Sequence, residues 1–535
     1  MLHTVRQFST SNIKRMSFTY SESVNKLNSL QTNAALLDQL RKAGPRMNQY
    51  SLPEMRHYFK RIGYEPKDFD HLQIIHVTGT KGKGSTSALT QSILRHFPTD
   101  RPLRTGLFTS PHLVAVRERI RINGEPISEE LFAKYSEDVW TRLENTKDQH
   151  VIFGQEFMTA DDPKKAIRDQ RAQPDKPIYF RYLTLLALHA FVQEKVDVAI
   201  LEVGVGGEYD STNIIEKPIV CGITALGLDH VSVLGNTIDQ IAWHKSGIIK
   251  QNRPVVCFDQ PPEAMEVVKQ RAADKNAALE IIYPSQIADL KDIDIGLAGV
   301  HQCYNSLTAV ALAKKWLEEC RGIQFDKNQP IPEGFREGLK KVVWPGRGQR
   351  LPIVNTKYAS KVTSDKDMTW YLDGAHTMES LGVCTEWFKD VAQKDGNESD
   401  ANDVSRILVF NCTNGRDGPR LLSTISQLQT SATKFDHVVF TTNVTFREGY
   451  TTDNTNNTVS IADALAMQTM LADSWSEQVP GFGKENIHVV GSIEEAVDWT
   501  VNFAKNATSK KIQVLTTGSL ILVGNTLTVL GMPSQ

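Results

Sequence analysis

The sequence lacks the features of a secreted, membrane-spanning or nucleic-acid-binding protein. Its 6 cysteines are scattered with no C-x-x-C pair, so neither a disulfide framework nor a zinc site is expected, and a reducing compartment fits best. Lys and Arg number 60 against 62 Asp and Glu, a net charge of −2, which leaves no general basic field for a nucleic-acid backbone. Polar residues and glycines interrupt the uncharged stretch 514–535. We therefore expect no nucleic-acid partner and no membrane span.

The 535 residues exceed one ordinary hydrophobic core, so two domains are expected. Apolar strand-like runs alternate with helical segments, which predicts an α/β fold. Residues 20–343 are predicted to form a P-loop-type ATPase domain with a doubly wound, mainly parallel sheet. The Pro- and Gly-rich segment 330–350 marks the boundary, with a linker at 344–366. A smaller C-terminal Rossmann-like α/β domain is expected at 367–535. Polar insertions are expected at 145–176, 394–403 and 453–458.

The N-terminal segment 1–19 has the composition of a mitochondrial presequence. The first acidic residue is Glu22, whereas three basic residues stand among Ser, Thr and apolar residues before it. A disordered basic tail is the alternative reading. Met16 offers a second start that would leave a cytosolic form, so we expect mitochondrial and cytoplasmic pools.

A glycine-rich loop follows the predicted strand that begins at Ile74, in the sequence IIHVTGTKGKGSTS. Its glycines allow tight turns and close backbone approach to an anion, and the following helix N-terminus adds partial positive charge. Lys83 would supply a full charge. The loop departs from the Walker pattern G-x-x-x-x-G-K-[ST] because Gly84 stands before Ser85. A simple glycine-rich turn is the alternative, but the strand before and the helix after favour a nucleotide site.

Three residues at predicted strand ends are candidates for a metal site. Mg²⁺ prefers oxygen ligands, and Glu202 ends an apolar run directly before a glycine-rich turn. A surface charge is the alternative for Glu202. Ser110 and His230 also follow predicted strands, but each alone is ambiguous, and imidazole is an unusual magnesium ligand.

Four other residues are ambiguous on chemistry alone. Lys245 stands in a mainly apolar helical segment, where a lysine that extends its amine to solvent is the default interpretation. His189 is interpreted as a histidine at the edge of the core. Arg347 and Asp373 flank the predicted domain boundary, where a second domain could close over a nucleotide.

Together these motifs resemble the folylpolyglutamate synthases of the Mur ligase superfamily. The resemblance extends from about Ser21 to near the C-terminus. The motifs are GTKGKGS at 79–85, TSPHL at 109–113, RERIRINGEPIS at 117–128, YFRYLTLLALHAF at 179–191, EVGVGGEYDSTNI at 202–214, LGLDH at 226–230, HKSGI at 244–248, WPGR at 344–347, YLDGAHT at 371–377 and TTGSLILVG at 516–524.

The resemblance implies a role for each matching residue. The ATP phosphates would contact Gly82, Lys83, Gly84 and Ser85. The magnesium ligands would be Ser110, Glu202 and His230. The other nucleotide contacts would be Asn305, Arg347 and Asp373. Lys245 matches a lysine that relatives carry in carbamylated form, and Lys83 and Lys245 are the implied catalytic residues. Ser306 departs from the alanine usual in the family.

The activity implied is ATP-dependent addition of L-glutamate to the γ-carboxyl of tetrahydrofolate glutamate tails through an acyl phosphate. The implied cofactors are ATP and Mg²⁺, with a monovalent cation, and a monomer is expected. A dihydrofolate synthase, which adds the first glutamate to dihydropteroate, shares these motifs and is the nearest alternative. A nucleotide-dependent binding module without ligase activity is a more distant one.

Overall fold

The computed structural model describes residues 17–31, 49–149, 152–153, 171–172, 174–363, 365–396, 403–412, 416–451, 453 and 461–532. Most of the expected presequence and most of the three expected insertions lie outside these ranges. No helix within them is long and apolar enough to cross a membrane.

The first domain is built on an eight-stranded, mainly parallel sheet. Only the last two strands in its order run antiparallel to their neighbours. In spatial order the strands are β10 (Leu279–Ile282), β9 (Val255–Phe258), β8 (Val220–Ile223), β1 (Ile75–Thr78), β7 (Val198–Glu202), β2 (Thr105–Phe108), β3 (Ile120–Ile122) and β4 (Glu125–Pro126).

Helices cover both faces of this sheet, as the nearly continuous apolar runs predict. Alternate residues of β7 belong to different layers: Ile200 packs with one set of helices and Leu201 with the other. One layer contains α4 (Lys83–His96), α11 (Val300–Arg321) and α12 (Arg336–Lys341). The other contains α1 (Tyr20–Asn28), α3 (Ser51–Arg61), α5 (Glu129–Asn145) and α7 (Tyr179–Gln193). The chain also forms α8 (Val231–Leu234), α9 (Ile238–Ser246), α10 (Pro262–Asp274) and a small pair of strands, β5 (Ile152–Phe153) and β6 (Arg171–Ala172).

The second domain has a six-stranded sheet in the order β11-β12-β16-β13-β14-β15, in which only β11 is antiparallel. These strands are β11 (Gln349–Pro352), β12 (Asp367–Leu372), β16 (Lys511–Thr517), β13 (Val404–Phe410), β14 (His437–Thr441) and β15 (Ile487–Val490). One face packs against α13 (Met378–Gly396), α14 (Gly418–Ser426) and α15 (Ile461–Gln478). The other packs against α16 (Ile493–Asn506) and α17 (Leu520–Val529).

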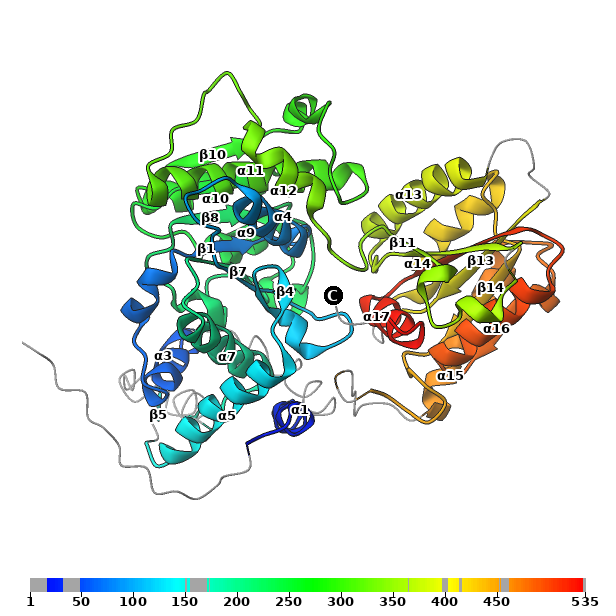
Figure 1. Ribbon diagram of the computed structural model, residues 1–535, viewed down its shortest axis with the longest axis horizontal. Coiled ribbons are helices and arrows are strands. Elements are labelled where there is room, and N and C mark those ends of the chain that lie inside the picture. The colour runs from blue at the N-terminus through cyan, green and yellow to red at the C-terminus, as the bar shows by residue number, and fades with distance from the viewer. Residues whose placement is uncertain are drawn as a thin grey trace, which may run out of the picture.

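The two domains lie side by side, with α17 on the side of the second domain that faces the first (Figure 1). Part of the segment expected to be a linker, 344–366, is integral to the second domain. Strand β11 pairs with β12, and Ile353, Tyr358 and Val362 belong to its hydrophobic core. Only residues 342–348 separate α12 of the first domain from β11 of the second, and this short connection limits how far the domains can move apart.

Candidate active site

The glycine-rich loop joins β1 to α4 in a conformation that only glycine tolerates well. Gly79 and Gly82 have φ values of 150° and 86°. A Cβ atom on Gly82 would lie 2.2 Å from Asn305 Oδ1, and one on Gly79 would lie 1.9 Å from Thr224 Oγ1. No side chain caps the N-terminus of α4, so its first-turn N–H groups can bind an anion.

Two lysine side chains converge on one carbonyl of this loop. Lys83 Nζ donates to Gly79 O at 3.0 Å, and Lys245 Nζ donates to the same oxygen at 2.7 Å. Lys245 is 3% exposed, and burial lowers the pKa of its amine well below the ordinary value. The expectation that Lys245 extends to solvent is therefore wrong, because α9 packs its side chain beneath the glycine-rich loop, residues 79–85, which is called the phosphate loop below.

Glu202 ends β7 beside the phosphate loop and is 4% exposed. Its Oε2 accepts a hydrogen bond from the backbone N–H of Ser110 at 2.9 Å, which places the turn after β2 against the end of β7. Burial raises the pKa of the Glu202 carboxyl, and the positive charge of Lys83 opposes this. The interpretation of Glu202 as an exposed surface charge is thus wrong.

His230 lies after β8 in a left-handed backbone conformation with φ of 52°. Burial lowers the pKa of its imidazole, and the Asp229 carboxylate partly offsets this, so the ring is neutral at physiological pH. Across the part of the chain that is described, no three His, Cys, Asp or Glu side chains are grouped closely enough to hold a metal. A magnesium ion here would therefore need oxygen atoms from hydroxyls, phosphates and water in addition to the Glu202 carboxylate.

Asn305 holds the phosphate loop against α11. Its Oδ1 lies 3.4 Å from Thr86 Oγ1, and its Nδ2 donates to Gln302 Oε1 at 2.9 Å. The neighbouring Ser306 is fully buried, and its hydroxyl has no hydrogen-bond partner among the described residues. At this departure from the family the chain thus gains a buried polar group without a compensating contact.

The second domain contributes Arg347 and Asp373. Asp373 accepts hydrogen bonds from the backbone N–H groups of Gly348 at 2.8 Å and Ala375 at 2.9 Å. Burial raises the pKa of Asp373, and the Arg347 guanidinium opposes the rise. Arg347 lies against the backbone of the turn after β12, because a Cβ atom on Gly374 would be 2.6 Å from its Nη1.

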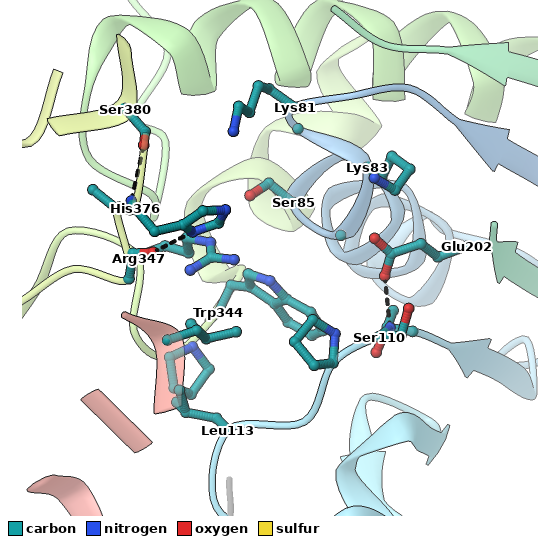
Figure 2. Close-up of a pocket in the computed structure, with 18 of the residues that line it drawn as sticks. Lys81, Lys83, Ser85, Ser110, Leu113, Glu202, Trp344, Arg347, His376 and Ser380 are labelled. Carbon is teal, nitrogen blue, oxygen red and sulfur yellow. Dashed lines mark hydrogen bonds between the residues drawn. The ribbon is translucent and has the colours of Figure 1, made fainter. Parts of the chain in front are cut away.

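These groups line one cavity of about 930 Å³ between the domains. Figure 2 shows Lys83, Glu202 and Ser110 on one wall, with Arg347 and His376 across the cavity from them. All the predicted site residues line this cavity except Lys245, which reaches the phosphate loop from below. The structure therefore brings together residues that are separated by nearly 300 positions of sequence.

Sequence reasoning missed three cavity residues that stand within or next to the recognised motifs. His376 follows Asp373 in YLDGAHT; its Nδ1 lies 3.0 Å from Gly374 O, and burial lowers its pKa to about 4. Trp344 begins WPGR and lies 5.0 Å from the guanidinium of Arg121. Arg119 donates to His112 Nδ1 at 2.9 Å. Their position inside the motifs was the signal that could have identified these residues. Residue type alone could not, because lone His, Trp and Arg residues are common in structural roles.

Comparison with known proteins agrees with this arrangement. A family model described as the C-terminal domain of dihydrofolate synthetase matches residues 355–529. The folylpolyglutamate synthase of Neurospora crassa is 40% identical over 525 residues, covering 96% of this chain and 91% of its own. A Mycobacterium tuberculosis folylpolyglutamate synthase complexed with ADP shares the fold, with a TM-score of 0.66, 22% identity, and coverage of 96% and 100%. A structure described as an FPGS-AMPPCP-folate complex does so with a TM-score of 0.61, 23% identity and the same coverage. The chain belongs to the folylpolyglutamate synthase family.

Proposed function

We propose that this protein uses ATP to join L-glutamate to the γ-carboxyl group at the end of the glutamate tail of tetrahydrofolate and its polyglutamates. The products are folylpolyglutamates one residue longer, ADP and phosphate. One observation carries the proposal: in a chain that matches a folylpolyglutamate synthase almost end to end, the phosphate loop and Asp373 line the same cavity. The cavity is large enough for a ligand of this size.

The chemistry explains why ATP is needed. A carboxylate is a poor electrophile because its leaving group would be oxide. Transfer of the γ-phosphoryl group to the tail gives an acyl phosphate, and the amine of the incoming glutamate then attacks its carbonyl carbon. An amide bond forms, phosphate leaves, and the amine loses a proton. No side-chain nucleophile is required.

The residues of the chain would bind and orient the reactants and would exclude water from them. The first turn of α4 presents its N–H groups to the phosphates, and Lys83 adds a full positive charge beside them. Arg347 and Asp373 would contact the nucleotide from the second domain. Holding the reactants in this geometry can lower the barrier by about 7–11 kcal/mol. A cavity closed by two domains also protects the acyl phosphate from water.

Magnesium and a monovalent cation belong to this proposal. Glu202 and Ser110 supply oxygen atoms and His230 a nitrogen atom, a set that fits Mg²⁺ when phosphates and water complete the shell. Bound there, Mg²⁺ would neutralise the charge of the transferred phosphoryl group.

We also propose that Lys245 is carbamylated. An uncharged amine nitrogen attacks the carbon of CO₂ and loses a proton, which leaves an anionic carbamate, and the buried Lys245 amine is suited to this because its pKa is lowered. NMR of protein prepared with ¹³C-bicarbonate should show a carbamate signal that is absent from Lys245→Ala. Short carboxylic acids should partly restore the activity of that variant. Full activity of Lys245→Ala without them would refute this role.

One assay tests the function and separates its alternatives. The protein is incubated with ATP, labelled glutamate and either tetrahydrofolate or dihydropteroate as acceptor. We expect incorporation with tetrahydrofolate and successive products of increasing length. Incorporation into dihydropteroate alone would favour dihydrofolate synthase, the activity named by the C-terminal family model. Incorporation into neither would favour a binding module.

Localisation and assembly complete the proposal. We propose mitochondrial and cytoplasmic forms that differ by use of Met16 as a second start, and a monomer in each compartment. Fluorescent fusions carrying Met1→Ala or Met16→Ala should each lose one of the two pools. Sedimentation equilibrium of the purified protein should give the mass of one chain.

A further inference from the structure

The loop that follows β2 belongs to the first domain but is buried against the second. Leu113, in this loop, is 8% exposed and is part of the apolar cluster of the second domain. A Cβ atom on Gly524 of α17 would lie 1.8 Å from Leu113 O, so the helix and the loop backbone are in direct contact. The loop, residues 109–116, is therefore an inter-domain element. It also carries Ser110, whose N–H group is bonded to Glu202.

Two carboxylates, one from each domain, hold the backbone of this loop. Glu118 accepts hydrogen bonds from the N–H groups of Leu113, Val114 and Ala115 at 2.8, 3.0 and 2.8 Å. The next N–H group, that of Val116, donates to Asp453 Oδ1 of the second domain at 2.8 Å. Four consecutive amides are thus bonded to carboxylates, and the last depends on the other domain.

Asp453 has two further contacts with the first domain. The hydroxyl of Tyr20, on α1, donates to the same Oδ1 atom at 2.5 Å. The carbonyl oxygen of Asp453 lies 3.2 Å from His112 Nε2, and Arg119 Nε donates to the other ring nitrogen of His112 at 2.9 Å. A single residue of the second domain therefore contacts α1, the loop 109–116 and, through His112, a guanidinium that lines the cavity.

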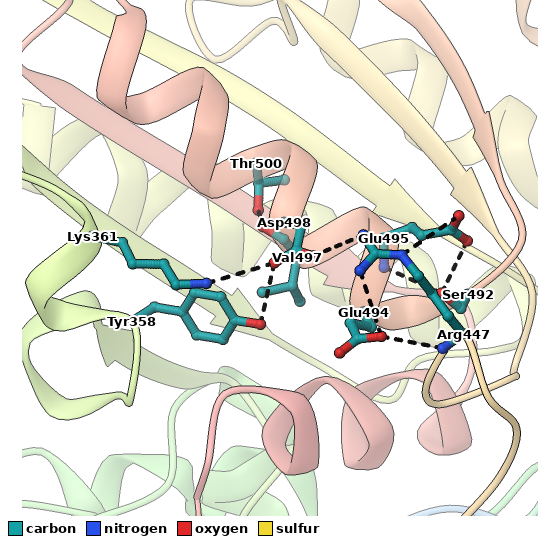
Figure 3. Close-up of polar contacts among 9 residues, drawn as sticks. All are labelled: Tyr358, Lys361, Arg447, Ser492, Glu494, Glu495, Val497, Asp498 and Thr500. Carbon is teal, nitrogen blue, oxygen red and sulfur yellow. Dashed lines mark hydrogen bonds and ion pairs between the residues drawn. The ribbon is translucent and has the colours of Figure 1, made fainter.

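The chain that leads to Asp453 is fixed to its own domain (Figure 3). Six positions earlier, Arg447 donates to Asp498 Oδ2 of α16 at 2.9 Å, and its backbone N–H donates to Glu494 at 3.1 Å. Phe446 and Gly449 exchange backbone hydrogen bonds across the turn. Each exposed ion pair is weak alone, but together these contacts tie the base of the segment to α16.

We propose that Asp453 is an inter-domain positioning residue, which orders the loop 109–116 when the two domains are docked. Asp453 does not line the cavity, so it acts through the loop and not on the reactants. When the second domain docks, Asp453 therefore also places Ser110, His112 and Arg119. The catalytic consequence rests on the proposed function, whereas the ordering of the loop does not.

Hydrogen exchange by mass spectrometry on the full-length protein tests the ordering. In Asp453→Ala, exchange of the peptide that contains the Val116 amide should increase about tenfold or more, because the amide loses a charged acceptor. Asp453→Asn retains a carbonyl oxygen and should show a smaller increase. Exchange in β7 and β16 should not change. Asp473→Ala, at an exposed aspartate of α15 in the same domain, is the matched control and should behave as wild type.

Kinetics test the consequence for the site. Asp453→Ala should raise KM for the folate acceptor about tenfold and KM for ATP by a smaller factor, because the loop carries His112, which contacts the cavity residue Arg119, whereas the phosphate loop is held by α11. Tyr20→Phe removes one donor without exposing the core and should give a smaller change in the same direction.

Unchanged exchange at Val116 in Asp453→Ala would overturn the proposal. So would an increase spread equally over both sheets, which would mark a general loss of stability. If Asp453→Ala does not fold, Asp453→Asn and Tyr20→Phe decide by the same criterion. If the wild-type protein incorporates no glutamate, the proposed function is refuted. The exchange experiment would still test the ordering of the loop, because it does not depend on catalysis.

Discussion

At the scale of single residues, Lys83 is placed to bind the phosphates, and its side chain contributes little to the packing of the fold. Among the described residues, its amine donates hydrogen bonds to backbone carbonyls of the loop, those of Gly79 and Thr80. Lys83→Ala should therefore fold normally and lose about a hundred- to a thousandfold in kcat, the usual cost of removing one group that stabilises transition-state charge. Glutamate incorporation and thermal unfolding measure the two effects. Lys60→Ala, at an exposed lysine of α3, is the control, and near-normal turnover of Lys83→Ala would rule out the phosphate-loop assignment.

His76 shows how burial in the strand that leads into this loop affects stability. It lies fully buried in β1, Nε2 is 2.8 Å from Thr212 Oγ1, and Nδ1 has no partner among the described residues. Burial lowers its pKa to about 3. Between pH 6.5 and 3 the unfolded chain binds a proton that the folded protein excludes, so stability falls as pH falls through this window.

His76→Leu should remove that dependence. The loss of unfolding free energy on acidification from pH 6.5 should be smaller in the variant than in wild type, by up to about 4 kcal/mol if the pH scan reaches 3. Urea titrations at a series of pH values measure it. His71→Leu, at an exposed histidine, is the matched control for replacing a histidine with leucine. Parallel curves for wild type and His76→Leu would contradict the prediction.

At the scale of elements, the phosphate loop and its helix are held together by close packing at Gly82. Gly82→Ala carries two penalties, a strained φ of 86° and a Cβ atom 2.2 Å from Asn305 Oδ1. Gly322, at the end of α11, has φ of 66°, and no atom lies within 4 Å of the place that a Cβ atom would take there, so Gly322→Ala carries the backbone penalty alone.

The pair of variants separates the two penalties. Gly322→Ala should lower the unfolding free energy by about 1–2 kcal/mol without changing activity. Gly82→Ala should lower it further and weaken ATP binding at least tenfold, because the loop must move away from Asn305. Denaturant unfolding and nucleotide titration provide the measurements. Equal destabilisation with unchanged ATP affinity would show that the loop accommodates the methyl group freely.

The elements of both domains were largely predictable, because long apolar runs and helical periodicity dominate them. The apolar run 219–225 predicts a strand and forms β8, and the apolar segment 180–193 predicts a helix and forms α7. The segment 116–127 alternates and then turns at Asn123-Gly124, which predicts an extended chain. It begins instead with a 3₁₀ turn at Val116–Arg119, where the Glu118 side chain accepts three backbone N–H groups. That turn depends on local hydrogen bonding, which hydrophobic periodicity does not report.

At the scale of the whole molecule, the sequence could identify site residues but not how they meet. Motif spacing pointed to Glu202 and Asp373 separately, whereas the cavity that they share exists only because two sheets pack side by side. Nothing in the periodicity of β2 or α17 predicts that Leu113 of one domain enters the apolar cluster of the other. Contacts between domains depend on shape and position, which single-sequence patterns do not encode.

We expect the contacts of Trp344 to help hold the two domains in the closed arrangement. It stands at the junction of the domains, lies 5.0 Å from the Arg121 guanidinium, and its ring would be 3.5 Å from a Cβ atom on Gly84 of the phosphate loop. Trp344→Ala should remove about 1–2 kcal/mol that favours the closed arrangement, which shifts the ratio of closed to open molecules about five- to thirtyfold.

More water would then reach the acyl phosphate, so Trp344→Ala should hydrolyse more ATP for each glutamate added than wild type does. Measuring ADP release and labelled product in one reaction gives this ratio. Trp499→Ala, at a residue of α16 that does not line the cavity, controls for the loss of a large aromatic side chain and should keep the wild-type ratio. An unchanged ratio in Trp344→Ala, with both activities reduced equally, would mean that the tryptophan stabilises the fold without controlling how tightly the domains enclose the reaction.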